Sequence, residues 1–482
     1  MEAPHVMVVG DEAHLPGNPH KYDDLLCPPA IIDPMAVEGG EEKGKKHKIR
    51  RETGDYDAAH HRFRTLTKEY SQQYAPLYYH RLQKMRPRLL QAAKERWEGK
   101  LGVSSSSSST AKLPRIVNKI LELRADEEVI VAGTLYKEMP LRPNILESYA
   151  KERSIIPPPL RSNYVSEKDR LIIEDESGRI SLVGVDLPTD LVVTGIIVAI
   201  RGVELKDGDF QVDDIIFTGI PMQLKRPILE KDKYVALVSG INIGEEVRNP
   251  LAVQLMVDYL SGHIGGAAEQ EFESRISRLI IAGNSLVPPE EKTDGAAVKN
   301  YQKVLCQLAA SMHVDIMPGA GDPANFVLPQ QPFNPCLFPT ASRYATFSSV
   351  TNPYQCRVDG LFIVGHSGQP VDDIKKYIDP SKTDTLRIME DTLNWSHLAP
   401  TTPDTLGAYP FSGEDPFVLD ECPHIYFAAN QATYDSKLIT GPKGQVVRLI
   451  SVPSFTKTST IVLVNLKTLA THPITFNADL DL

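Results

Sequence analysis

The second half of the chain alternates short apolar runs with glycine loops and helical segments, and this alternation restricts the possible folds more than any other feature. Apolar runs at residues 234–238, 278–282 and 314–317 each lead into a glycine-containing loop. Predicted helices near residues 250–261 and 294–312 follow the first two loops. Successive strand–loop–helix units favour a partly parallel sheet whose functional loops lie at the carboxyl ends of its strands.

Four later apolar runs do not alternate with helices in this way. They lie at residues 361–364, 425–427, 446–452 and 460–466. We interpret them as strands in mixed or antiparallel pairing that complete a layered α/β sandwich. The predicted domain covers residues 230–482.

Residues 111–225 have an apolar period close to two, which is typical of strands. Strand candidates lie at residues 128–136, 170–174, 179–183, 191–200 and 210–218, and the fourth is expected to bend at Gly195. The second and third flank a Glu176-Ser177-Gly178 turn and form a predicted hairpin. Five strands with a long insertion at 139–168, including a short helix near 144–153, fit a small OB-type β-barrel.

The first 54 residues combine glycine, proline and charge without periodicity, which predicts a largely disordered tail. The tail contains a basic run from Lys43 to Arg51. This run is either a solvated stretch of charge or an importin-binding signal, and the sequence leaves both interpretations open.

A helical segment is predicted over residues 55–100, where apolar residues recur every three or four positions. Pro76 and Pro87 interrupt this pattern and suit the first turns of new helices, so we expect two or three short helices. The serines at 104–109 are then a flexible linker to the barrel.

Charge and cysteine usage exclude several classes of protein. A net charge of −10 argues against nonspecific nucleic-acid binding by the whole surface. The five scattered cysteines supply neither a zinc knuckle nor a disulfide framework. The amino terminus is unlike a signal peptide, and no apolar run is long enough to span a bilayer. We therefore expect a soluble intracellular protein.

The three glycine loops at strand ends resemble those of the metallophosphoesterase (calcineurin-like) fold. Such enzymes hold two metal ions roughly 3.5–4 Å apart. The resemblance implies ligands in the patterns Asp-x-His, Gly-Asp, Gly-Asn-His-Asp, a lone His and Gly-His-x-His. The corresponding positions here carry amides, small side chains and one carboxylate: Gly240, Asn242, Asn284, Ala320, Gly321, Asp322, Ser367, Asn430 and Ala432.

This residue set is too weakly charged for a dinuclear centre. Two divalent cations repel each other strongly, and several ionised or imidazole donors are needed to offset that repulsion. Of the nine positions, only Asp322 is ionisable. We expect the domain to be inactive, with no catalytic and no metal-binding residues.

Other titratable residues near the predicted loops are interpreted as packed or surface groups. They are His313, His366, His397, His424 and the pair Asp372 and Asp373, which suits a solvated helix start.

Several long motifs, in order, resemble the B-subunits of replicative DNA polymerases, most strongly their delta branch. The motifs lie at residues 317–325, 328–332, 351–355, 367–371, 397–407 and 421–424. The resemblance extends from about Tyr56 to the carboxyl terminus. It implies a helical element, an OB fold and an inactive phosphoesterase domain assembled into a nuclear scaffold for DNA replication and repair.

The same resemblance implies the partners. The scaffold would hold the cysteine-rich C-terminal domain of the catalytic subunit and dock the third subunit, with a fourth subunit in the complex. It would meet the sliding clamp and DNA indirectly, through the holoenzyme. No cofactor is expected on this chain, since the metal or iron–sulfur centre belongs to the partner. The residues that contact each partner are not predictable from the sequence.

Two alternatives stay open at this point. The chain is a divergent phosphoesterase if Asn242, Asn284 and Asp322 retain one metal ion. It binds single-stranded DNA directly if the barrel offers stacking aromatics and a basic groove. The barrel strands contain only Tyr136 and Phe210 with Phe217, among many acidic residues, so a protein ligand is favoured there.

Overall fold

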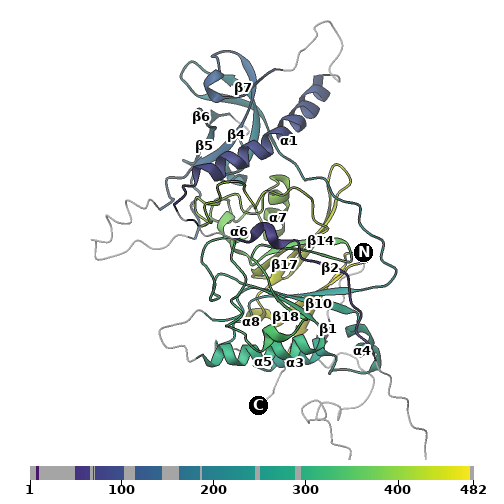
Figure 1. Cartoon of the computed structure of the whole chain (residues 1–482). Helices are drawn as coiled ribbons and strands as arrows, with labels where there is room; N and C mark the ends of the chain where they lie inside the picture. The colour runs from purple at the N-terminus through teal and green to yellow at the C-terminus, as the bar shows by residue number, and fades with distance from the viewer. Residues whose placement is uncertain are drawn as a thin grey trace, which may run out of the picture.

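The computed structural model describes residues 7–9, 49–65, 69, 71–101, 114–143, 162–184, 187–244, 250–287 and 295–477. Within these ranges the strands form three sheets. Figure 1 shows the arrangement, with a barrel and helix α1 at one end and a stack of sheets and helices at the other. The fold is therefore a mixture of α and β structure in layers.

The barrel is a six-stranded sheet whose strand β7 also pairs with β4, which closes it. Its strands are β3 (Arg115–Val117), β4 (Glu128–Glu138), β5 (Arg170–Glu174), β6 (Arg179–Val183), β7 (Ile197–Glu204) and β8 (Phe210–Phe217). The β5–β6 hairpin has the predicted bounds. Most of the insertion after β4, including the helix predicted near 144–153, lies outside the described residues.

One barrel strand was predicted too early in the chain. Residues Thr189–Leu191 form a 3₁₀ turn, and β7 starts only at Ile197. Gly195 lies between them with a φ of +94°, which favours glycine. A Cβ atom there would clash with the carbonyl oxygen of Pro400. The expected bend at Gly195 is therefore present, but the part of the candidate before it is not a strand, because barrel and sandwich approach closely there.

Helix α1 (Ala75–Leu101) is one continuous helix, so the prediction of two or three short helices is wrong. Pro76 lies in its first turn, as expected, but Pro87 lies in its interior. A helix proline removes one hydrogen bond and costs about 3 kcal/mol. The cost is offset because the apolar face of α1 packs on the barrel, through Leu82, Met85, Leu89, Ala93 and Trp97.

The sandwich contains two mixed sheets. The first has the order β1 (Met7–Val9), β19 (Thr471–Phe476), β18 (Thr460–Asn465), β9 (Tyr234–Val238), β10 (Ile276–Ala282), β11 (His313–Met317) and β12 (Phe347–Ser349). The second has the order β16 (Asp435–Thr440), β17 (Val446–Pro453), β15 (Ile425–Gln431), β14 (Leu361–His366), β13 (Tyr354–Val358) and β2 (Tyr56–Asp57). Strands β9 to β12 are parallel, as the strand–loop–helix pattern predicts. The later strands are mixed, which is one of the two pairings expected for them: β14, β15 and β17 are parallel, whereas β13, β16 and β18 pair antiparallel with their neighbours.

Helices cover the outer faces of both sheets. They are α3 (Pro250–Ser261), α4 (Ala267–Glu273) and α5 (Ala296–Ser311) on the first sheet, and α6 (Gln369–Ile374) and α7 (Thr385–Asn394) on the second, with the short α8 (Phe455–Thr458) between β17 and β18. One apolar core lies between the sheets. Another core continues from the second sheet and its helices into the barrel, so these parts share one interior.

The prediction of a disordered tail is wrong for residues 7–9, which form β1 and pair with β19, and for residues 49–54. Arg51 donates hydrogen bonds to the carbonyl oxygens of Leu260, Glu273 and Ile276, at 2.6–2.9 Å. These carbonyls belong to the ends of α3 and α4 and the start of β10. The last arginine of the basic run is thus part of the fold, whereas Lys43–Lys48 and the serine linker lie outside the described residues.

Candidate functional site

The loops after β9 and β10 of the first sheet meet those after β14 and β15 of the second. Gly283 follows β10, and a Cβ atom added to it would clash with the Oγ of Ser367. A Cβ atom on Gly240 would lie 2.9 Å from the Oδ1 of Asn430. The structure therefore brings most of the predicted former metal positions together at one edge of the sandwich.

Asn242 and Asn284 hold their two loops side by side. The backbone N–H of Asn242 donates to the carbonyl oxygen of Asn284 at 3.0 Å. Both residues have positive φ angles, which asparagine tolerates better than most side chains. The Oδ1 of Asn284 accepts the N–H of Gly321 at 3.0 Å. The backbone of Asn242 and the side-chain amide of Asn284 thus stabilise loop geometry.

Asn430 bridges the two sheets. Its Nδ2 donates to the carbonyl oxygens of Ala282, at 3.1 Å, and Ser367, at 2.9 Å. Its N–H donates to the Oγ of Ser239. Its Oδ1 is buried and has no hydrogen-bond partner among the described residues.

Asp322 is buried, and its carboxylate binds backbone. Its Oδ1 accepts the N–H groups of Ser285 and Leu286 at 2.8 and 2.9 Å, and its Oδ2 accepts that of Gly319 at 2.8 Å. Burial raises the pKa of Asp322 to about 6, against the opposing effect of these donors. The one charged member of the predicted set therefore ties the β10 loop to the β11 loop.

Three predicted positions contribute little to this cluster of side chains. Ala320 and Ala432 are exposed, and Gly321 contributes only its backbone N–H to Asn284. Among the described residues there is no group of three or more His, Cys, Asp or Glu side chains that would hold a metal ion.

An amide network that was not predicted as part of the site completes it. The Oε1 of Gln330 accepts hydrogen bonds from Asn352 and Gln369, at 2.8 and 2.9 Å. The Oδ1 of Asn352 accepts the N–H of Ser367, and the Nε2 of Gln330 donates to the carbonyl oxygen of Gly319. All three amides lie in motifs that carried the family resemblance, which was the available signal for them.

The histidines near the loops are engaged in hydrogen bonds. The Nδ1 of His366 accepts the N–H of Gly368, and its Nε2 lies 3.3 Å from the hydroxyl of Tyr426. Burial lowers the pKa of His366 to about 3, so the ring is neutral. His397 pairs with Asp415 at 2.9 Å and is not one of the predicted former metal positions.

His424 and the remaining candidates also have structural surroundings. The ring of His424 accepts the N–H of Phe362 and lies 3.1 Å from the carbonyl oxygen of Leu224. His313 is half-buried at the start of β11. In α6, Asp372 is exposed in the first turn, while Asp373 is buried and pairs with Lys376.

Comparison with known proteins decides the family. The family model for the DNA polymerase delta subunit OB-fold domain matches residues 73–215, and that for the B-subunit of DNA polymerase alpha/epsilon matches residues 235–436. The DNA polymerase delta small subunit of Arabidopsis thaliana is 43% identical over 445 residues, which cover 89% of this chain and 97% of that protein. The chain belongs to the DNA polymerase delta small-subunit family.

Further members of the DNA polymerase delta small-subunit family are more distant. The Drosophila melanogaster subunit is 37% identical and the Saccharomyces cerevisiae subunit 32%, covering 86% and 84% of this chain and 96% and 90% of their own lengths. A purple acid phosphatase from yellow lupin aligns with 9% identity and a TM-score of 0.25, over 58% of this chain and 60% of that one, which is too weak to inform the fold. The resemblance to the delta branch of the polymerase B-subunits, inferred from the sequence, is confirmed by these relatives.

Membership of the delta small-subunit family gives the chain an accessory, non-catalytic role in DNA polymerase delta. No helix in the described part of this small subunit is long and apolar enough to cross a membrane.

Proposed function

We propose that the chain is a nuclear scaffold whose phosphoesterase-like domain has lost catalysis and serves assembly. It would bridge the catalytic subunit and the third subunit of the polymerase, in replication and repair. The observation that carries this proposal is the amide-rich cluster at the sheet edge, in which the one carboxylate, Asp322, accepts three backbone N–H groups.

The electrostatics of this cluster argue against a dinuclear metal site. Amide oxygens are neutral, so Asn242, Asn284 and Asn430 offset none of the repulsion between two divalent cations. The Oδ1 of Asn284 already accepts an N–H, and so do both oxygens of Asp322. A metal ion would have to displace hydrogen bonds that hold the loops.

A scaffold also has to be rigid, and the contacts at the junction between barrel and sandwich are consistent with a rigid connection. Arg81 of α1 is fully buried and donates to the carbonyl oxygens of Gly195 in the barrel and of Pro400 and Thr402 in the sandwich. It also pairs with Asp415 at 2.6 Å. One side chain thus fastens helix, barrel and sandwich to each other.

The scaffold role is tested by co-expressing the full chain with the catalytic subunit, and separately with the third subunit. We expect stoichiometric complexes in both cases, and a complex of all three that requires this chain. If the other two subunits associate equally well without it, the bridging role is wrong.

The loss of catalysis is tested by assaying the purified chain with Mn²⁺ on nucleotides and generic phosphate esters. We expect no turnover. Turnover that disappears in Asp322→Asn and survives in Asp207→Asn, an exposed position in a barrel turn, would instead establish a divergent phosphoesterase.

A further inference from the structure

The segment that connects barrel and sandwich, residues 219–229, is extended and fixed along one side. The N–H of Cys422 donates to the carbonyl oxygen of Met222 at 2.9 Å. The side chain of Gln223 forms two hydrogen bonds with the backbone of Val446, at 2.8 and 2.9 Å. His424 binds the carbonyl oxygen of Leu224. The segment is therefore held in place by the sandwich.

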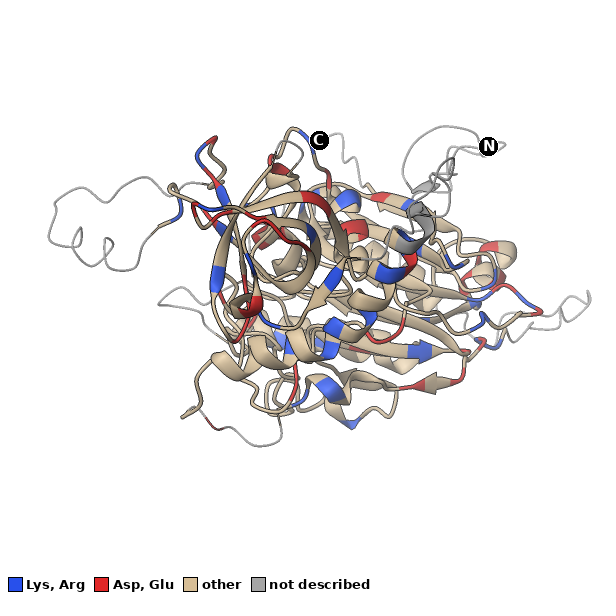
Figure 2. Ribbon diagram, turned by 90° about the horizontal axis from the view of Figure 1, so that it is seen from above, with Lys and Arg blue, Asp and Glu red and all other residues tan. Residues whose placement is uncertain are grey.

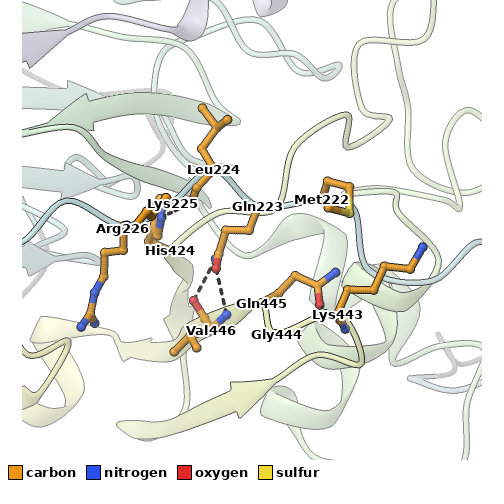
Figure 3. Close-up of a pocket in the computed structure, with 10 residues that line it drawn as sticks. All are labelled: Met222, Gln223, Leu224, Lys225, Arg226, His424, Lys443, Gly444, Gln445 and Val446. Carbon is orange, nitrogen blue, oxygen red and sulfur yellow. Dashed lines mark hydrogen bonds between the residues drawn. The ribbon is translucent and has the colours of Figure 1, made fainter.

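The free side of this segment is apolar to an unusual degree. In an extended chain, every second side chain points to the same face. Met222, Leu224 and Ile228 are 65%, 58% and 90% exposed, and Arg226 between them is exposed as well. Figure 3 shows Gln223 pointing toward Val446, whereas Leu224 points the opposite way. We call the exposed apolar residues Met222, Leu224 and Ile228 the linker stripe; it is about 20 Å long at the rise of a strand.

A hollow of about 290 Å³ adjoins the linker stripe. The segment from Met222 to Arg226 and His424 beside it line one side, and the turn at 443–446 lines the other (Figure 3). Small-molecule sites usually occupy about 300–1,000 Å³, so this hollow suits one or two side chains of a docked protein segment better than a separate ligand.

The charges around the hollow indicate which side chains a docked segment would present. Lys225, Arg226 and Lys443 line it and are exposed, on a chain whose net charge is −10. Figure 2 shows how lysine and arginine are distributed among acidic residues over the rest of the ribbon. A basic rim beside apolar anchors is complementary to a segment that presents apolar side chains flanked by carboxylates.

We propose that the linker stripe, with Lys225 and Lys443, docks an apolar segment bearing Asp or Glu side chains from the catalytic subunit of the polymerase. The inference rests on the scaffold function proposed above and names the surface that performs it. The linker stripe lies on the segment that connects barrel and sandwich, so a partner bound there can contact both of them.

The test measures the affinity of the full-length chain for the purified catalytic subunit. We expect Met222→Ser with Leu224→Ser to weaken binding at least tenfold, because buried apolar anchors dominate such interfaces. Lys443→Glu is expected to weaken binding more at low salt than at high salt, because exposed charges are screened. Leu121→Ser and Lys206→Glu are matched controls on the barrel. Leu121 is 81% exposed, and the side chain of Lys206 is 83% exposed.

The outcomes separate the two proposals. If the unmodified chain does not bind the catalytic subunit, both proposals are overturned. If it binds, and the stripe variants bind with equal affinity, the docking surface is wrong while the scaffold function stands. Weakened binding to another subunit alone would likewise overturn the choice of partner. Thermal unfolding of the variants should match that of the unmodified chain, since the replaced side chains are exposed.

Discussion

Asp322 is the residue at which a structural role and a catalytic role predict different results. Asp322→Ala removes the acceptor of three buried N–H groups, and each unsatisfied group costs about 1–3 kcal/mol. We expect the free energy of unfolding, measured with urea, to fall by several kcal/mol. Asp359→Ala, which breaks a partly exposed pair with Lys233 and one hydrogen bond from the N–H of Asp55, should cost less. Equal effects would contradict the anchoring role.

The buried pair of His397 and Asp415 predicts a loss of stability in acid. Burial, reinforced by Arg81, lowers the pKa of His397 to about 4. The unfolded chain therefore binds a proton at higher pH than the folded chain does. About 3 kcal/mol is lost as the pH falls from 6.5 to 4.

Asp415 adds to this loss at lower pH. Burial alone would raise its pKa, but Arg81 and His397 outweigh burial and lower it, so the stability it contributes above pH 4 disappears below that value. Urea titrations between pH 7 and 4 should show a flatter profile for His397→Gln, and an unchanged profile would contradict this account.

Among the elements, α1 carries an interior proline that its surroundings tolerate. Pro87 is exposed, so Pro87→Ala restores a backbone hydrogen bond without disturbing the barrel face of the helix. We expect a gain of as much as about 3 kcal/mol, seen as a higher melting temperature. Lys94→Ala, also exposed on α1, should change it little. A destabilised Pro87→Ala chain would mean that the proline fits a local distortion.

Local sequence patterns predicted helices and strands best where the spacing of apolar residues matches the side chains that the fold buries. The bounds of α3 and of the β5–β6 hairpin were predicted to the residue. The failures at Pro87 and at the start of β7 share a cause, since both depend on contacts between segments far apart in the chain. The same holds for the site. Its members at strand ends were identifiable from position, whereas the amides of Gln330, Asn352 and Gln369 join it only through the tertiary fold.

At the scale of the whole molecule, the continuous core predicts that barrel and sandwich unfold together. Cluster residues such as Val131 of the barrel and Tyr377 of the sandwich belong to one apolar interior. Calorimetry should therefore show a single transition across both. Arg81→Met should lower the free energy of unfolding by about 3–5 kcal/mol, because it leaves Asp415 buried without its cation, yet keep one transition.

A surface arginine of the same helix provides the comparison. Arg96 pairs with Asp214 with half of its side chain exposed, and exposed pairs contribute about 0–1 kcal/mol. Arg96→Met should therefore be nearly neutral. Two separate transitions in the unmodified chain would mean that barrel and sandwich unfold independently, and would contradict the shared core. A partner bound to the linker stripe would then not be held by one rigid body, and the rigid-scaffold proposal would have to be abandoned.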